Sequence, residues 1–274
     1  MPARSTAGLG TVSRPRNSSS RLPVLMYHGI HADERSAGVY NPLYSVAVDE
    51  FAAQLDWLAD HGYRTTLLAE RARSPRDVVL TFDDGDVSWT AVALPLLVER
   101  GMVAEFCVTS DYVDRPGRIT RDEVRELAHH GMGVLSHGRT HRLLSTLPRE
   151  ELEEELTSSR RDLERWSGGP VLGLSAPGGR AGARELRVAR AAGYAFVLNS
   201  VPGPNRRPRP GRYLHRLAVT RTTTLEQFAG LVRWRGPAAR RLLLRTAALE
   251  APKRVLGDDR YERLRAVILR RGEG

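Results

Sequence analysis

Two groups of residues in this chain of 274 residues have the types and spacing that metal-assisted hydrolysis needs. Asp83 and Asp84 are adjacent and follow the apolar run 78–80, so we expect them at the carboxyl end of a buried strand. Neighbouring residues on an extended chain point to opposite sides, so the two carboxylates should have different tasks. Further along, His137 and His141 are four positions apart and would share one face if their segment were helical.

One carboxylate and two imidazoles form a ligand set that suits Zn²⁺, with Co²⁺, Ni²⁺ or Fe²⁺ as alternatives. A metal held by Asp84, His137 and His141 would keep coordination positions open for water and substrate, as a catalytic site requires. Asp83 would then be the general base that accepts a proton from the water. This constellation predicts the hydrolysis of an amide or an ester.

The elements that must position these residues are short apolar runs that alternate with helical patterns. This alternation predicts an α/β fold with a parallel sheet, and at this length a barrel is at least as probable as an open sheet. Asp49 is the expected N-cap of the first helix, and Thr120 with Glu123 has the spacing of a capping box. The expected strands lie within 22–30, 63–68, 78–82, 103–109, 132–136, 172–176, 196–198 and 214–219. The expected helices are 51–60, 89–100 with a kink at Pro95, 120–130, 148–166, 183–192 and 224–232.

The formal net charge of +10 is concentrated at the two ends of the chain. Residues 1–21 contribute +4 and residues 233–274 contribute +7, which leaves the region between them close to neutral. A nucleic-acid partner is therefore not expected, because its binding surface would need basic residues beside the working site.

Composition divides the chain into three parts. Residues 1–20 are rich in Ser and are expected to be disordered, residues 21–232 form the catalytic domain, and residues 233–274 form a basic helical extension. The extension could cap the domain, or it could dock on a partner or on the inner face of a membrane. Residues 1–20 contain no apolar run of the length that a secretory signal needs, so we expect a cytoplasmic location. The oligomeric state is not predicted.

The chain resembles the polysaccharide deacetylase family, which contains the NodB homology domain and forms carbohydrate esterase family 4. Residues 81–85, Thr-Phe-Asp-Asp-Gly, resemble the first motif of the family, and residues 137–141, His-Gly-Arg-Thr-His, resemble the second. Residues 24–28 and 51–63 resemble the N-terminal part of the branch that includes deacetylases of poly-N-acetylglucosamine.

The resemblance implies a distorted (β/α)7 barrel of the NodB type, here with the C-terminal helical extension. It also implies a metal held by Asp84, His137 and His141, with Asp83 as the general base. The family removes acetyl groups from N-acetylated sugars, and some members act on O-acetylated sugars.

The remaining motifs of the family are altered in this chain. Residues 174–179 stand where the third motif belongs, and the backbone N–H of Gly178 would help to stabilise the oxyanion. The third motif usually supplies an Arg that orients the base, but Ser175 or Ala176 stands there, with Arg180 close by. The Asp of the fourth motif is replaced by the pair Asn199 and Ser200.

The fifth motif usually supplies a His as general acid. His215 is the candidate, because it is the last His in the chain, and His28 is the alternative. Together with His28, we expect Tyr27, Pro177 and Arg180 to line the substrate site.

The sequence therefore predicts a metal-dependent deacetylase that acts on an N-acetylated sugar, such as a nucleotide-linked, lipid-linked or natural-product N-acetylhexosamine. An O-acetyl esterase with the same site is the first alternative. The second is a carbohydrate-binding module that keeps the fold and the metal but has lost catalysis, and the missing Arg and Asp motivate it.

Overall fold

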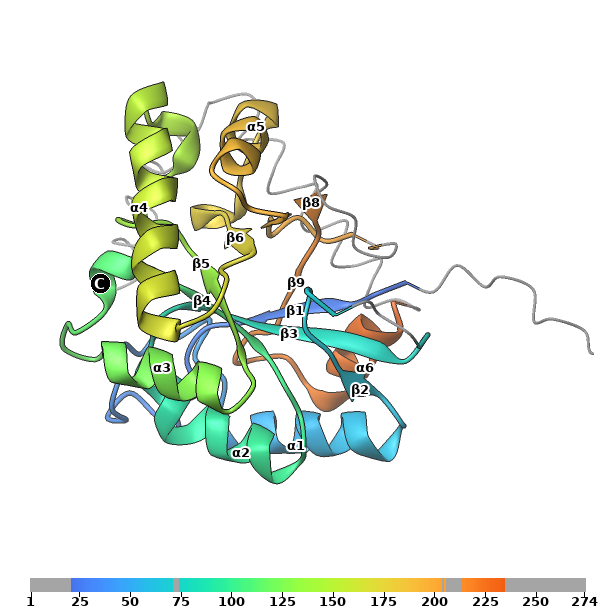
Figure 1. Cartoon of the computed structure of the whole chain (residues 1–274). Coiled ribbons are helices and arrows are strands. Elements are labelled where there is room, and N and C mark those ends of the chain that lie inside the picture. The colour runs from blue at the N-terminus through green and yellow to red at the C-terminus, as the bar shows by residue number, and fades with distance from the viewer. Residues whose placement is uncertain (1–20, 71–73, 204, 206–212, 235–274) are drawn as a thin grey trace, which may run out of the picture.

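A computed structural model describes residues 21–70, 74–203, 205 and 213–234. In it, helices surround a curled sheet (Figure 1). The predicted disorder of residues 1–20 and the predicted helices beyond residue 234 lie outside the described residues.

The sheet confirms the predicted parallel arrangement. Its strands follow the spatial order β8-β7-β6-β5-β4-β3-β1-β9, with β2 paired to β3, and all the pairs are parallel. Parallel strands place all their carboxyl ends at one edge, which is where the predicted site residues lie. The strands are β1 (Val24–Tyr27), β2 (Arg64–Thr65), β3 (Asp77–Asp84), β4 (Glu105–Val108), β5 (Gly133–Ser136), β6 (Gly173–Ser175), β7 (Phe196–Leu198), β8 (Tyr213–Leu214) and β9 (Leu217–Ala218).

The two ends of the sheet are joined by one short segment of chain. β8 pairs with β7 and β9 pairs with β1, although only His215 and Arg216 separate them in sequence. The single strand predicted over 214–219 is therefore two strands, because the chain leaves one edge of the sheet and joins the other. The two residues between these strands therefore connect the two edges of the curled sheet.

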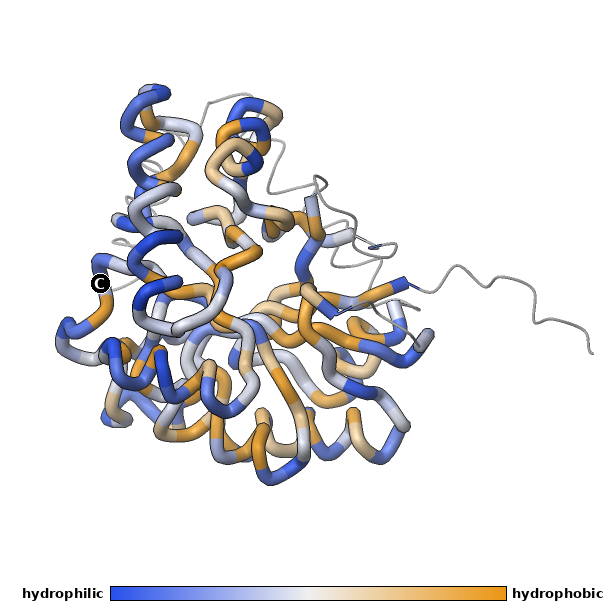
Figure 2. Tube along the Cα trace, in the orientation of Figure 1, coloured by the Kyte–Doolittle hydropathy of each residue, from blue (hydrophilic) through white to orange (hydrophobic). Residues whose placement is uncertain are grey.

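Helices cover the outside of the sheet and turn their hydrophobic faces inward (Figure 2). Among the described residues, no helix is both long enough and apolar enough to cross a membrane. The helices are α1 (Val48–Asp60), the π-helical segment η1 (Trp89–Ala93), which continues into α2 (Leu94–Glu99), α3 (Arg121–His129), α4 (Arg149–Ser167), α5 (Ala183–Ala191) and α6 (Leu225–Arg233).

The helix boundaries test the predicted caps. The capping box of Thr120 and Glu123 is confirmed, since each side chain accepts from the backbone N–H of the other residue. Asp49 as the N-cap of the first helix is wrong, because α1 already begins at Val48 and Asp49 lies in its first turn, where its charge favours the helix dipole. The expected break near Pro95 is present as the change from π-helix to α-helix.

Stacked aromatic rings hold together the strands that carry the site. The ring of Phe82 on β3 lies 5.2 Å from that of Tyr27 on β1 and 4.9 Å from that of Phe106 on β4, measured between centroids. All three side chains are fully buried, and such pairs add about 0.5–1.5 kcal/mol beyond the burial of their area. The carboxyl ends of these strands are therefore rigid supports for the residues that follow them.

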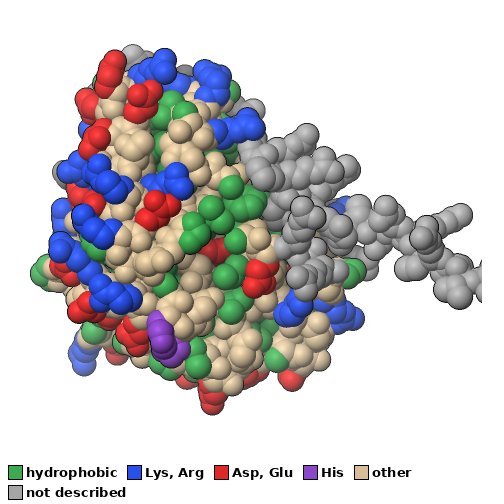
Figure 3. All heavy atoms as spheres, viewed as in Figure 1, with side chains coloured by type: hydrophobic (Ala, Val, Ile, Leu, Met, Phe, Trp, Pro, Cys, Tyr) green, Lys and Arg blue, Asp and Glu red, His purple; other side chains and the backbone are tan. Residues whose placement is uncertain are grey.

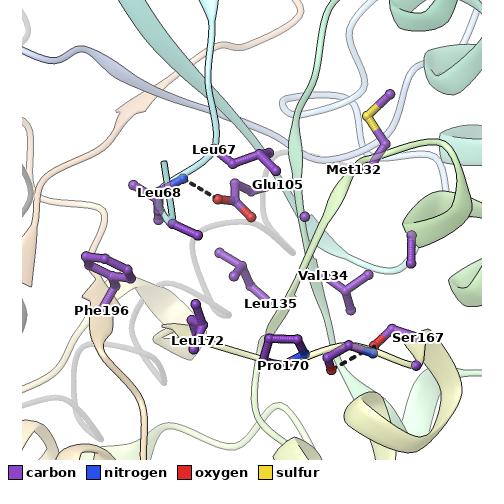
Figure 4. Close-up of a pocket in the computed structure, with 15 residues that line it drawn as sticks. Leu67, Leu68, Glu105, Met132, Val134, Leu135, Ser167, Pro170, Leu172 and Phe196 are labelled. Atoms are coloured by element: carbon purple, nitrogen blue, oxygen red, sulfur yellow. Dashed lines mark hydrogen bonds between the residues drawn. The ribbon is translucent and has the colours of Figure 1, made fainter. Parts of the chain in front are cut away.

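A cavity of about 350 Å³ lies at the amino ends of β4 to β7, which is the opposite end of the barrel from the predicted site (Figure 4). Its side chains are apolar apart from Ser167 and the buried carboxyl group of Glu105. Glu105 accepts a hydrogen bond of 2.6 Å from the backbone N–H of Leu68. Figure 3 shows the outer face of the molecule in the orientation of Figure 1, where charged side chains gather over α4 and hydrophobic ones lie nearer the centre.

Candidate metal centre and active site

Strand β3 ends at Asp83 and Asp84, whose side chains have different surroundings. The side chain of Asp83 is 3% exposed, whereas that of Asp84 is 27% exposed. The backbone of Asp84 has a φ of 88°, a left-handed conformation that is costly for a residue other than glycine. The strand thus turns at this residue and presents the second carboxylate to the histidines.

The structure brings together the three predicted metal ligands. The Oδ1 atom of Asp84 lies 3.4 Å from Nε2 of His137 and 3.2 Å from Nε2 of His141. Ligand atoms bound at about 2.0–2.1 Å to a tetrahedral ion lie about 3.3–3.4 Å apart, so this spacing fits one small divalent ion. The same Oδ1 atom is buried without a hydrogen-bond partner, as expected of an atom that a cation would satisfy.

A hydrogen bond behind His137 sets its orientation. Its Nδ1 atom lies 2.8 Å from the carbonyl oxygen of Ser175, which can only accept, so Nδ1 carries the proton. The Nε2 atom therefore presents its lone pair to the candidate metal position, which is the arrangement that histidine ligands need.

The segment that carries His141 is a loop, so the helix considered for it is wrong. Its backbone is held by Glu155 of α4, whose Oε1 atom accepts from the N–H groups of Arg139 and Thr140 at 2.8 and 2.7 Å. His141 itself has a φ of 66°, again left-handed. The buried carboxylate of Glu155 thus accepts the hydrogen bonds that backbone carbonyl oxygens would accept in a helix, and it fixes the loop in this way.

The predicted base, Asp83, is bound by Arg216 from the segment between β8 and β9. Two parallel hydrogen bonds of 2.7 Å join its carboxylate oxygens to Nη1 and Nη2 of the arginine, whose side chain is fully buried. The hydroxyl of Ser175 donates to the same carboxylate at 3.2 Å. The expectation that Asp83 lacks its orienting Arg is therefore wrong, since the Arg comes from a different strand end.

This environment keeps both carboxylates ionised. Burial by itself would raise the pKa of Asp83, but the charge of Arg216, helped by His137, outweighs it and holds the pKa well below its ordinary value. Burial also acts to raise the pKa of Asp84, and the adjacent His137 and His141 more than offset it, so this pKa is lowered as well. Both groups can therefore accept a proton or bind a cation at neutral pH.

His28 at the end of β1 lies close to these charges. Burial lowers its pKa, and the nearby Asp83 and Asp84 act in the opposite direction. Its Nδ1 atom is buried without a hydrogen-bond partner, while its ring stacks on that of Tyr44 at 4.4 Å between centroids. An aromatic contact, not a carboxylate, thus fixes the plane of this imidazole.

Tyr44 belongs to the loop 31–46, which several buried contacts fasten to the domain. The His31 ring lies 2.9 Å from the hydroxyl of Ser45 and 3.1 Å from the carboxylate of Asp86. Asp86 follows shortly after β3, the strand that carries Asp84. Arg221 donates to the carbonyl oxygens of His31 and Ser45. The loop is therefore positioned by the same strand end as the metal ligands.

The other predicted site residues have mixed outcomes. Tyr27 does not line the site, because it is fully buried on the helix side of the sheet and donates to Gln54 of α1 at 2.8 Å. Gly178 is exposed and left-handed beside the buried Pro177, and Arg180 is half-buried. Their roles, oxyanion stabilisation for Gly178 and substrate contact for the other two, stay predictions.

The His215 ring has contacts of its own. Its Nδ1 atom lies 3.1 Å from the carbonyl oxygen of Val201, and its backbone N–H donates to Asn205. The charges that affect the pKa of His28 include both acids and His137. The nearness of these charges favours His28 over His215 as the histidine of the site. The acid role of His215 stays a prediction.

Sequence reasoning missed Arg216 and Glu155. Arg216 is the one charged residue in the apolar pattern 214–219, and that was the available signal. Glu155 belongs to a run of acidic residues that resembles a solvated helix face, so the sequence pattern does not indicate that its side chain is buried.

Fold and site together define a parallel barrel with one carboxylate and two imidazoles poised for a metal beside an ionised, buried acid. Residues 70–197 match the polysaccharide deacetylase family. A protein of Bacillus subtilis described as a polysaccharide deacetylase, YxkH, is 30% identical over 209 residues, which cover 73% of this chain and 72% of that protein. The chain belongs to the polysaccharide deacetylase family.

Two further comparisons agree with this assignment. A peptidoglycan-N-acetylglucosamine deacetylase of Bacillus cereus is 29% identical over 122 residues, 44% of this chain and 55% of that one. The crystal structure of a polysaccharide deacetylase from Bacillus cereus superimposes with a TM-score of 0.69 at 28% identity, covering 77% of this chain and 69% of that chain. The predicted family and NodB-type barrel are thereby confirmed.

Proposed function

We propose that the protein is a metal-dependent hydrolase that removes the acetyl group from an N-acetylated sugar. The observation that carries the proposal is the ligand set of Asp84, His137 and His141 beside the ionised carboxylate of Asp83. The similarity of part of the chain to a deacetylase of N-acetylglucosamine supports an amide substrate.

The three ligands fit a divalent ion, with Zn²⁺ as the first candidate and Co²⁺, Ni²⁺ or Fe²⁺ as alternatives. Such an ion, when bound, supplies a Lewis acid that acidifies water and polarises the acetyl carbonyl. Ser175 keeps His137 in the tautomer that can bind it, and Glu155 holds the loop of His141.

Asp83 takes the proton from the attacking water. Its two hydrogen bonds to Arg216 fix the plane of the carboxylate and leave lone pairs free for the water. As a carboxylate whose pKa is held low, it is in the basic form throughout the neutral range.

The departing amine must receive a proton, and we assign this step to His28 in preference to His215. His28 lies among the charges of the site, and its stack on Tyr44 leaves the unpartnered Nδ1 atom available. The backbone N–H of Gly178 is the expected donor to the oxyanion.

Arg216 also removes one of the two reasons for considering a binding module without catalysis, since it orients the base. The other reason, the missing Asp of the fourth motif, remains, and the measurement of acetate release tests it. The cytoplasmic location, and a membrane contact through residues 233–274, remain predictions of the sequence.

Acetate release from N-acetylated and O-acetylated sugars tests the function. We expect release from N-acetylated sugars that Asp83→Asn reduces by roughly 10²–10⁴-fold with the metal content unchanged. Asp84→Ala should lose both metal and activity. Release only from O-acetylated sugars would favour the esterase, and metal binding without any acetate release would favour the binding module.

A further inference from the structure

The segment 110–119 lies between the two chain segments that carry the metal ligands. At its start, the backbone N–H groups of residues 110 and 111 donate to the carbonyls of Gly138 and Arg139, in the loop that carries His141. At its end, the N–H of Ile119 donates at 2.9 Å to the carbonyl of Gly85, the neighbour of the ligand Asp84. The segment is thus fixed to both sides of the candidate metal centre.

An aromatic ring in this segment faces the metal ligand His141. The Tyr112 and His141 rings lie 5.8 Å apart between centroids. Two guanidinium groups lie over the same tyrosine, with Cζ of Arg118 at 4.6 Å from its centroid and Cζ of Arg115 at 5.5 Å. The tyrosine therefore holds two cations beside the metal ligand.

The positive charge of these two cations is not neutralised locally. The acidic neighbours in the segment are bound by other arginines, Asp111 by Arg139 at 3.2 Å and Asp114 by Arg121 at 2.9 Å. Within the described part of the chain, no carboxylate lies in ion-pair distance of Arg115 or the half-buried Arg118. By contrast, Arg216 and Arg139, two other arginines close to the site, each pair with a carboxylate.

We propose that Arg115 and Arg118 form a phosphate-binding subsite, and that the substrate is an N-acetylated sugar with a phosphate or diphosphate at its anomeric carbon. The planar guanidinium binds phosphate through two parallel hydrogen bonds, so two of them match such a group. An acetamido group at C2 and a phosphate at C1 are on adjacent ring carbons, which fits an anion site one side chain away from His141. This inference rests on the proposed deacetylase function.

The test compares kcat/KM for acetate release from N-acetylglucosamine 1-phosphate and from its neutral methyl glycoside. We expect the phosphate to be the better substrate by about tenfold or more, and Arg118→Gln to remove most of this preference through KM while leaving the methyl glycoside unaffected. Arg115→Gln should act in the same direction. Arg125→Gln, whose guanidinium pairs with Asp122 on the exposed face of α3, is the matched control and should change neither substrate.

Two further arms separate the sources of the phosphate. A nucleoside-diphosphate sugar and a polyprenyl-diphosphate sugar both carry the diphosphate that the subsite would bind. The one with the higher kcat/KM identifies the class of the natural substrate. Equal kcat/KM for the phosphate and the methyl glycoside would overturn the subsite while leaving the deacetylase function intact, and so would an equal loss on both in Arg118→Gln.

A binding measurement keeps the inference independent of turnover. Calorimetric titration of Asp83→Asn with N-acetylglucosamine 1-phosphate should give binding that Arg118→Gln weakens by about tenfold. If Asp83→Asn binds N-acetylglucosamine 1-phosphate equally well with and without Arg118→Gln, the subsite is overturned. Failure to release acetate from every sugar with every metal instead counts against the deacetylase function.

Discussion

The guanidinium of Arg216 binds the carboxylate of Asp83 through two hydrogen bonds of 2.7 Å, and both side chains are buried. The arginine stands between β8 and β9, the segment that joins the two edges of the sheet. Closing the barrel and orienting the base are therefore done by the same residues. Stability and catalysis should both depend on this pair.

We expect Arg216→Met to destabilise the fold by about 3–5 kcal/mol, because it leaves a buried carboxylate without its partner. Arg216→Lys keeps the charge but loses the two-pronged geometry, and should lower acetate release on the order of 10–100-fold at a smaller cost in stability. Urea unfolding and activity measured on the same preparations check both.

A double-mutant cycle isolates the ion pair. In the Asp83→Asn background the buried charge is gone, so Arg216→Met should cost clearly less than in the native protein. An equal cost in both backgrounds would mean that Arg216 stabilises the barrel through its packing and its bond to the carbonyl of Asn199, not through the base.

The hydrogen bonds of Glu155 to the loop that carries His141 predict an effect on metal affinity. Glu155→Ala removes the acceptor for the N–H groups of Arg139 and Thr140, so His141 loses its fixed position. We expect metal affinity to fall by about 10–100-fold, measured by titration with a competing chelator. Glu153→Ala, an exposed residue of the same helix paired with Arg149, should leave the affinity unchanged.

The stack of Tyr44 on His28 predicts a dependence on the leaving group. If the stack orients a proton donor, Tyr44→Ala should lower kcat for an acetamido sugar, whose amine must be protonated, by roughly 10²-fold or less. Hydrolysis of an aryl acetate, whose leaving group needs no proton, should be nearly unaffected. Tyr44→Phe keeps the ring and should restore the native value. An equal loss on both substrates would assign Tyr44 a structural role only.

The metal ligands could be predicted from sequence because their signals are local. An apolar run that ends in Asp83 and Asp84 places two acids at a strand end whatever the rest of the chain does. His137 likewise follows a strand directly, and only the backbone that carries His141 was uncertain. A local pattern was sufficient because parallel strands bring their carboxyl ends to the same edge.

Arg216 and Tyr27 show where local patterns fail. The role of Arg216 depends on the sheet curling until β8 and β9 meet its opposite edges, and no periodicity in 214–219 encodes that closure. Tyr27 precedes His28 directly, yet adjacent strand residues face opposite sides, so one enters the core while the other reaches the site. Tyr27 takes the core side because its ring packs against those of Phe51 and Phe82.

Glu105, at the far end of the barrel, predicts how stability changes with pH. Burial is the main cause that raises the pKa of this carboxyl group to about 7, well above the value of 4.5 in an exposed chain. Between these values the folded protein holds the proton and the unfolded chain does not, so stability should fall as pH rises and level off above about 7. The shift corresponds to about 3 kcal/mol at most.

Glu105→Gln tests this effect without removing the acceptor for the N–H of Leu68. The amide cannot ionise, so the variant should be about as stable as the native protein near pH 5 and more stable near pH 8, as measured by urea unfolding. Glu70→Gln, an exposed residue whose charge adds to the raised pKa of Glu105, should reduce the pH dependence only slightly. If the native protein and Glu105→Gln have the same profile from pH 5 to 8, Glu105 is ionised in the folded state, and the cavity around it must supply compensating polar contacts.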